Sequence, residues 1–161
     1  MTDQSVIEKA MATAIERARE TMSQDFGGPF GAAIIDPSGE IVAIASNTVL
    51  RDGDATAHAE INAIRQASRK RGTHDLTGHT IVTTGYPCPM CLGAIIWSNI
   101  KDVYYGCRPK DAEAIGFRDE FIYEYIRNPE LNEDVLRTSE SDRDSCLALF
   151  EEYVKKGKTI Y

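Results

Sequence analysis

Two short motifs constrain this chain more than any other feature, because each must begin a helix and both must meet at one point. One is His-Ala-Glu, starting at His58, and the other is Pro-Cys-Pro-Met-Cys, starting at Pro87. A Cys-x-x-Cys at the start of a helix turns both sulfurs toward one point, and Pro87 suits that start because it needs no backbone donor there. We expect His58 to open a helix over residues 56–71, with Thr56 as its cap. The fold must therefore bring two helix N-termini together.

The ligand types in these motifs predict a catalytic Zn²⁺ site formed by His58, Cys88 and Cys91. A catalytic zinc takes three protein ligands and leaves the fourth position to water, whereas a structural zinc is closed by a fourth Cys or His. The positive ends of the two helices favour the thiolate form that zinc requires. A redox Cys-x-x-Cys pair would come without the matching His-x-Glu. The other candidate ligands, none of which repeats either spacing, are His74, His79, Cys107 and Cys146.

Glu60 is predicted to move protons rather than to bind the metal. It follows His58 by two residues, about 200° around a helix of 3.6 residues per turn, so the two side chains cannot ligate one ion side by side. In zinc deaminases the metal acidifies a water that attacks the ring carbon bearing the amino group, while a glutamate carries protons. The two motifs together therefore predict hydrolytic deamination of a nucleobase-like ring.

Length and charge narrow the choice of partner. A chain of 161 residues fits one domain with a substantial core. The net charge of −7 and a pI near 5.0 argue against a large nucleic-acid surface and favour a small-molecule substrate. The basic run 69–71 falls at a predicted helix end, where cations are favourable. With no signal-like N-terminus, no apolar run long enough to span a membrane and no visible disulfide pattern, we expect a cytoplasmic protein without a membrane partner.

Hydrophobic periodicity and turn residues predict an α/β fold, a three-layer α/β/α sandwich around a mixed five-stranded sheet. The helices are expected over residues 3–23, 56–71, from the Cys-x-x-Cys to about residue 98, 111–128 and 144–155. The strands are expected over residues 30–35, 40–46, 80–84, 103–106 and, as a short edge strand, 133–137.

Four segments, GGPFGA, TAHAEINAIR, PCPMCLGAIIW and GFRDEFIY, stand in an order and spacing similar to the bacterial guanine deaminases of the cytidine-deaminase-like superfamily. The resemblance covers residues 4–161 and is strongest over 27–126. It implies deamination of guanine to xanthine and ammonia by a single domain over residues 1–161. It also implies a homodimer in which the C-terminal segment is swapped over the neighbour's active site, so that Tyr161 reaches the pocket in trans.

The same resemblance assigns substrate contacts. Asp119, in GFRDEFIY, is implied as a catalytic residue that recognises substrate or moves a proton, although a solvated acid or a helix cap would explain it too. Asn47 is implied to hydrogen-bond the base, and Asn is also a common turn residue. Phe30 could stack on the ring, although a Phe in a strand is more often part of the core.

One position departs from the family pattern, which usually has an acidic residue where this chain has Tyr86. The change is expected to reshape the pocket floor, so other substrates stay open: cytosine, guanosine, an aminopterin or another aminated ring. A tRNA adenosine deaminase is a further alternative, and the acidic pI and the GFRDEFIY segment count against it. A non-catalytic zinc-stabilised module is disfavoured by the intact Glu60.

Overall fold

The computed structural model describes residues 2–161. Its contacts divide the chain into two units, Met1–Ile122 and Tyr123–Tyr161. The first unit holds the sheet and the motifs, and the second holds helices alone.

The first unit is built on a four-stranded mixed sheet in the order β2-β1-β3-β4. Strand β1 (Gly31–Ile35) pairs antiparallel with β2 (Ile41–Ser46) on one side and with β3 (Thr80–Gly85) on the other. Strand β4 (Asp102–Cys107) runs parallel to β3. Helix α4 (Pro89–Trp97) connects these two parallel strands, so the residues after β3 lie at the carboxyl end of a parallel strand, where ligand sites commonly form.

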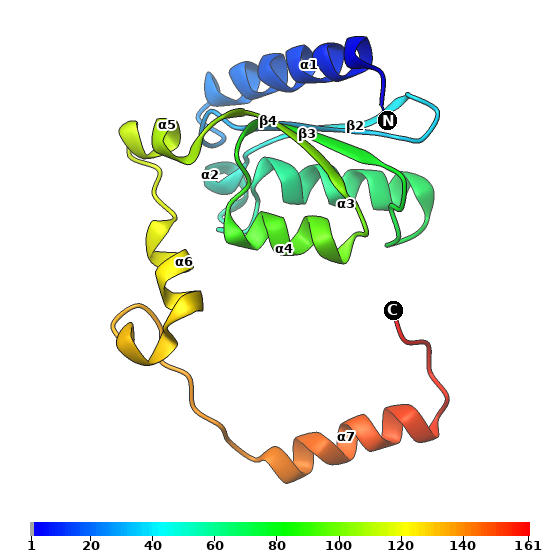
Figure 1. Cartoon of the computed structure of the whole chain (residues 1–161), viewed down its shortest axis with the longest axis vertical. Coiled ribbons are helices and arrows are strands. Elements are labelled where there is room, and N and C mark those ends of the chain that lie inside the picture. Colours follow the sequence, from blue (N-terminus) through cyan, green and yellow to red (C-terminus); the bar gives the residue numbers. More distant parts are fainter. Residues whose placement is uncertain (1) are drawn as a thin grey trace. The chain divides into compact units, whose positions relative to one another are not determined.

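Helices cover both faces of this sheet, so the three-layer α/β/α prediction is confirmed. Helix α1 (Gln4–Met22) lies on one face, and α3 (Ala59–Arg71) and α4 (Pro89–Trp97) lie on the other (Figure 1). Two apolar clusters fill the spaces between the layers, one under α1 and the other under α3 and α4. Small residues let α1 approach closely: a Cβ on Gly31 would lie 2.1 Å from the Ala14 carbonyl oxygen.

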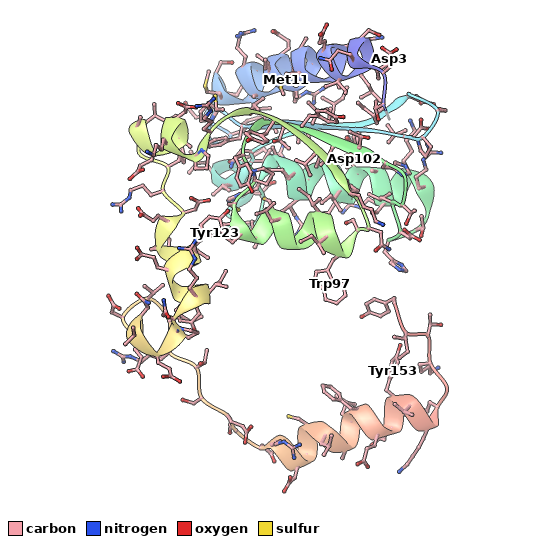
Figure 2. All side chains as sticks on the ribbon, in the orientation of Figure 1. Asp3, Met11, Trp97, Asp102, Tyr123 and Tyr153 are labelled. Carbon is pink, nitrogen blue, oxygen red and sulfur yellow. The ribbon has the colours of Figure 1, made fainter. Side chains whose placement is uncertain are left out.

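Helix α1 has a side-chain cap at its N-terminus. Asp3 caps α1, since its carboxylate accepts a hydrogen bond from the Ser5 N–H at 2.8 Å. Trp97 is the last residue of α4, and its side chain points away from the helix (Figure 2), with 75% of its surface exposed. In residues 2–161 no helix is both long and apolar enough to cross a bilayer.

The predicted fifth strand is wrong. Residues 133–137 form a turn and coil in the second unit, where the Val135 N–H donates to the Asn132 carbonyl oxygen at 3.0 Å. A five-residue stretch carries little strand preference of its own unless a neighbouring strand pairs with it. The sheet described here therefore has four strands rather than five.

The helix predicted over residues 111–128 is two helices, α5 (Pro109–Ala114) and α6 (Glu120–Arg127). Gly116 lies between them at a φ of +99°, a conformation that a side chain disfavours, and it turns the chain away from the axis of α5. The second unit continues with the short helix η1 (Pro129–Leu131) and with α7 (Arg143–Lys155). Large apolar side chains of α7 are exposed, among them Leu149, Phe150 and Val154 at 64, 68 and 73%.

Candidate active site

Three potential metal ligands converge where α3 and α4 begin. His58 is the N-cap of α3, Cys88 is the N-cap of α4, and Cys91 lies in the first turn of α4. The His58 Nδ1 atom is 3.6 Å from each sulfur, and the three ligand atoms all lie within 4.8 Å of one another. Within residues 2–161, these three side chains form the group of His, Cys, Asp or Glu residues whose ligand atoms lie close enough together to hold a metal ion.

The spacing of these atoms fits zinc. A tetrahedral ion with Zn–S of about 2.3 Å and Zn–N of about 2.1 Å places its nitrogen and sulfur ligands about 3.6 Å apart. The observed Nδ1–Sγ distances have this value. His74, His79, Cys107 and Cys146 are not members of the cluster. A catalytic zinc has three protein ligands and a fourth position left for water, and this cluster supplies three.

The local helix starts differ in detail from the sequence prediction. Thr56 does not cap α3; its N–H instead donates to the Asp54 carboxylate at 2.8 Å in a turn before the helix. His58 takes the cap position in an extended conformation that sets its ring at the helix end. Likewise the helical proline is Pro89 rather than Pro87, which makes Cys88 the cap. Both ligand-bearing helices thus begin two or three residues later than predicted.

The electrostatics of the cluster favour a thiolate. A hydrogen bond with Cys91 lowers the pKa of the Cys88 thiol to about 4 against the effect of burial, and a hydrogen bond with His58 adds to it. The same Cys88–Cys91 hydrogen bond, with burial, raises the pKa of Cys91. The opposite directions describe one proton shared by the two thiols. The pair therefore favours a thiolate, the form that binds zinc, and metal binding releases the remaining proton.

Glu60 lies in the first turn of α3 and is 8% exposed. Burial raises the pKa of its carboxyl, and the nearby Cys88 thiolate acts in the same direction. It stands outside the three-residue metal cluster but lines the same cavity as His58 and Cys88. The carboxylate is therefore positioned beside the metal site without being a member of the ligand set.

A cavity of about 720 Å³ opens above the cluster. It brings together nearly all of the residues that the sequence analysis selected. Cys91 is fully buried and does not line it. Tyr161 belongs to the second unit, and its role stays a prediction. The selected residues that line the cavity are Phe30, Asn47, His58, Glu60, Tyr86, Cys88 and Asp119.

Asn47 follows β2 directly and is 6% exposed. Its side-chain oxygen accepts hydrogen bonds from the Val49 N–H at 3.2 Å and the Gly28 N–H at 3.3 Å. These bonds orient the amide so that its NH₂ group is the remaining donor at the cavity wall. The approach requires glycine at position 27, because a Cβ there would lie 2.1 Å from the Asn47 oxygen.

Phe117 is a cavity residue that the sequence analysis missed. Its ring packs edge-on against Phe30, with ring centroids 5.0 Å apart and planes at 89°. The two rings form an aromatic wall of the kind that holds a flat ring. The signal lay within GFRDEFIY, but treating residues 111–128 as one helix hid the turn at Gly116 that brings Phe117 to the cavity.

Asp119 and Tyr86 occupy the same cavity. Asp119 precedes α6, and its carbonyl oxygen accepts the Ile122 N–H at 3.0 Å. Partial burial raises the pKa of the Asp119 carboxyl, and the negative charge of Cys88 adds to the effect. Tyr86 is 40% exposed and packs edge-on against Tyr105 at 4.9 Å between centroids. An acid at position 86 would replace this aromatic pair with a charge.

Fold and site together define a zinc-dependent aminohydrolase, and comparison with known proteins agrees. Residues 4–107 match the cytidine and deoxycytidylate deaminase zinc-binding region, so the chain belongs to that family. It is 43% identical over 122 residues to the guanine deaminase of Bacillus subtilis. This match covers 76% of this chain and 78% of the relative.

Solved structures give the same class. The X-ray structure of the B. subtilis guanine deaminase superposes with a TM-score of 0.88 at 35% identity, covering 100% of this chain and 99% of the other. The guanine deaminase of Nitrosomonas europaea matches with a TM-score of 0.67 at 36% identity over 74% of this chain and 66% of the other.

A relative with a different substrate also matches in sequence. The chain is 35% identical over 122 residues to a tRNA-specific adenosine deaminase of Haemophilus influenzae, with 75% of this chain and 69% of that protein covered.

Proposed function

We propose that this protein catalyses the zinc-dependent hydrolytic deamination of guanine to xanthine and ammonia. The observation that carries the choice of guanine is the extent of the similarity. The structural match to B. subtilis guanine deaminase extends over 100% of the chain, whereas a match to a tRNA:A34 deaminase covers 64%. Residues 108–161, which include the turn that supplies Phe117 and Asp119, lie beyond the family region.

His58, Cys88 and Cys91 would hold the zinc. When bound, zinc supplies an acidified water at neutral pH. The Glu60 carboxylate would carry two protons in turn. The first would pass from the attacking water to the ring nitrogen next to the reacting carbon, and the second from the added hydroxyl to the amine, which leaves as ammonia when the C–N bond breaks. The burial of Glu60 beside the ligands excludes bulk water from these transfers. Asp119, at the same cavity, is the second proposed proton carrier.

The remaining cavity residues are proposed to orient the base. The Asn47 NH₂ group donates to an acceptor on the ring, because its oxygen is already occupied by two backbone N–H groups. Phe30 and Phe117 contact the flat face and edge of the base. The Asp119 carboxylate accepts hydrogen bonds from N–H groups of guanine. An oxopyrimidine has fewer such groups. Tyr86 closes the cavity floor.

We further propose that the whole chain acts as a single deaminase domain in a cytoplasmic homodimer, with a small-molecule substrate and no nucleic-acid partner. The C-terminal segment would swap over the partner's site and bring Tyr161 to it. The exposed apolar side chains of α7 support this proposal, because a surface of that kind is normally covered. Light scattering of the zinc-loaded protein tests it: a dimer is expected, and a monomer at micromolar concentration contradicts it.

A substrate panel tests the proposed reaction. The zinc-loaded protein is assayed for ammonia release from guanine, guanosine, cytosine, adenine, an aminopterin and a tRNA anticodon stem-loop. Guanine is expected to have a kcat/KM at least about 10²-fold above every other compound, because a site built to pair with substrate N–H groups rejects analogues that leave its polar groups unpaired. Preferred turnover of another compound would reject guanine while keeping the reaction class. In that case Tyr86→Glu tests whether position 86 sets the preference, and gain of guanine turnover is the expected result.

A further inference from the structure

A second cavity, of about 480 Å³, lies beside α1, α2 (Val49–Asp52) and α3 and shares no lining residue with the substrate cavity. Four arginines line it, and Asp52 is the acidic residue among its lining side chains. This concentration of positive charge stands out on a chain whose net charge is −7. The four arginines, contributed by three helices, are Arg17, Arg51, Arg65 and Arg69.

Three of the four arginines already face acidic side chains, and the closest pair is Arg51 with Asp52, where Nε and Nη2 donate to the carboxylate at 2.7 and 3.2 Å. Arg17 pairs with Glu20 at 3.3 Å, and Arg65 approaches Asp54 at 3.8 Å, both with side chains about half exposed. Exposed pairs of this kind contribute about 0 to 1 kcal/mol, so a better anion can replace them. Among the ion pairs of residues 2–161, none involves Arg69, although its neighbours Lys70 and Arg71 are both paired. The cavity therefore keeps an excess of positive charge.

Polar side chains line the cavity together with the arginines, among them the buried Thr21 and Ser46 and the exposed Gln66. The Thr21 hydroxyl donates to the Ser46 hydroxyl at 2.8 Å, and these residues are 9% and 4% exposed. The Gln66 side-chain oxygen accepts the Ile44 N–H at 2.7 Å, which leaves the Gln66 NH₂ group as a donor. The Asn62 NH₂ group donates to the Thr48 hydroxyl at 2.9 Å and so fixes that wall. The cavity thus presents hydrogen-bond donors on a preorganised frame.

We propose that this cavity binds a phosphate group, either inorganic phosphate or a small phosphate monoester. Guanidinium groups match phosphate oxygens with paired, charge-assisted hydrogen bonds. Four guanidinium groups and a single carboxylate among the lining side chains favour an anion in this cavity. The volume holds a phosphate together with an attached sugar-sized group. Such a site is separate from deamination and does not depend on the substrate assignment.

Isothermal titration of the zinc-loaded, full-length protein tests this site at constant ionic strength. The probes are inorganic phosphate and ribose 5-phosphate, with ribose as the neutral control; none carries a base that could enter the substrate cavity. Saturable binding of one phosphate group per chain is expected, with no binding of ribose. Tighter binding of ribose 5-phosphate assigns the site to a monoester, and equal or tighter binding of inorganic phosphate assigns it to the free ion.

Two single-charge variants make the test specific. Arg69→Gln is expected to weaken phosphate binding about 10-fold or more, because it removes a charge-assisted contact. Arg19→Gln removes the same charge from α1, at an exposed pair with Glu16 outside the cavity, and is expected to leave the affinity unchanged. Thermal melting of both variants verifies that they fold. The proposal is overturned if neither probe shows saturable binding up to about 10 mM, roughly the weakest useful affinity. It is also overturned if both variants lose affinity equally, or if an RNA stem-loop binds where neither small probe does.

Discussion

The proton-carrying role of Glu60 gives the sharpest prediction about the chemistry. In Glu60→Gln the side chain keeps its size and loses its proton-accepting carboxylate. General acid–base groups contribute about 10²- to 10⁴-fold in rate, which corresponds to about 3 to 5 kcal/mol of barrier. Because Glu60 is 8% exposed and shielded from bulk water, we expect the loss in kcat to fall in that range with guanine as substrate.

The same substitution should spare the fold and the metal. Burial and the Cys88 thiolate both raise the pKa of Glu60, which means that its ionised form is disfavoured there and a neutral amide is tolerated. The melting temperature should stay close to that of the parent, because Gln is neutral and of the same size, and zinc content by atomic absorption should remain near one per chain. Glu113→Gln, at an exposed carboxylate that faces Arg118, is the matched control and should keep full activity. A rate for Glu60→Gln within 10-fold of the parent, with zinc unchanged, would refute the assignment and point to Asp119.

Four further predictions follow from the same geometry. Cys88→Ser should lose zinc and activity together, because two ligands hold the ion poorly; metal analysis and ammonia release check this, and an active metal-free protein would refute the zinc assignment. Asn47→Asp keeps the acceptor for Gly28 and Val49 but removes the NH₂ donor, so KM for guanine should rise about 10-fold or more in steady-state kinetics, and an unchanged KM would reject the contact. Burial opposes ionisation of Asp36, but hydrogen bonds from Ser38, the Glu40 N–H and Arg71 outweigh it and lower its pKa to about 2. Its ionised form therefore stabilises the fold above about pH 4, and the stability gap between the parent and Asp36→Asn in urea melts should shrink as the pH falls from 4 toward 2. Deletion of the last three residues through Tyr161 should lower activity with little change in helix content by circular dichroism, and a fully active dimer would remove the tail from the site.

The metal site was predictable because its signal is local. A His at one helix start and two Cys at another carry their chemistry in their spacing, and the structure brings them within 4.8 Å. The helix starts were harder to place. The Thr56 N–H donates to the Asp54 carboxylate in a turn before the helix begins. This local hydrogen bond competes with helix capping by Thr56, and a rule that considers one capping residue at a time does not predict it.

The errors lie where tertiary context decides. Residues 133–137 (EDVLR) have no alternation of polar and apolar side chains, and the chain turns at Asn132 instead of pairing as a strand. The predicted helix over residues 111–128 passed through Gly116, whose positive φ breaks it and brings Phe117 against Phe30. The arginine-lined second cavity left no mark in the sequence, because its residues are spread from Arg17 to Arg69 and meet only after α1, α2 and α3 have packed.

The central claim is hydrolytic deamination of guanine, and incubation of guanine with the zinc-loaded protein in H₂¹⁸O tests it most directly. Mass spectrometry should find xanthine carrying one ¹⁸O, with one ammonia released for each xanthine formed, because the attacking oxygen comes from solvent. The same protein after removal of zinc should form neither product above background. Guanine that stays unchanged in the presence of bound zinc, or xanthine that forms without solvent oxygen, would contradict the account.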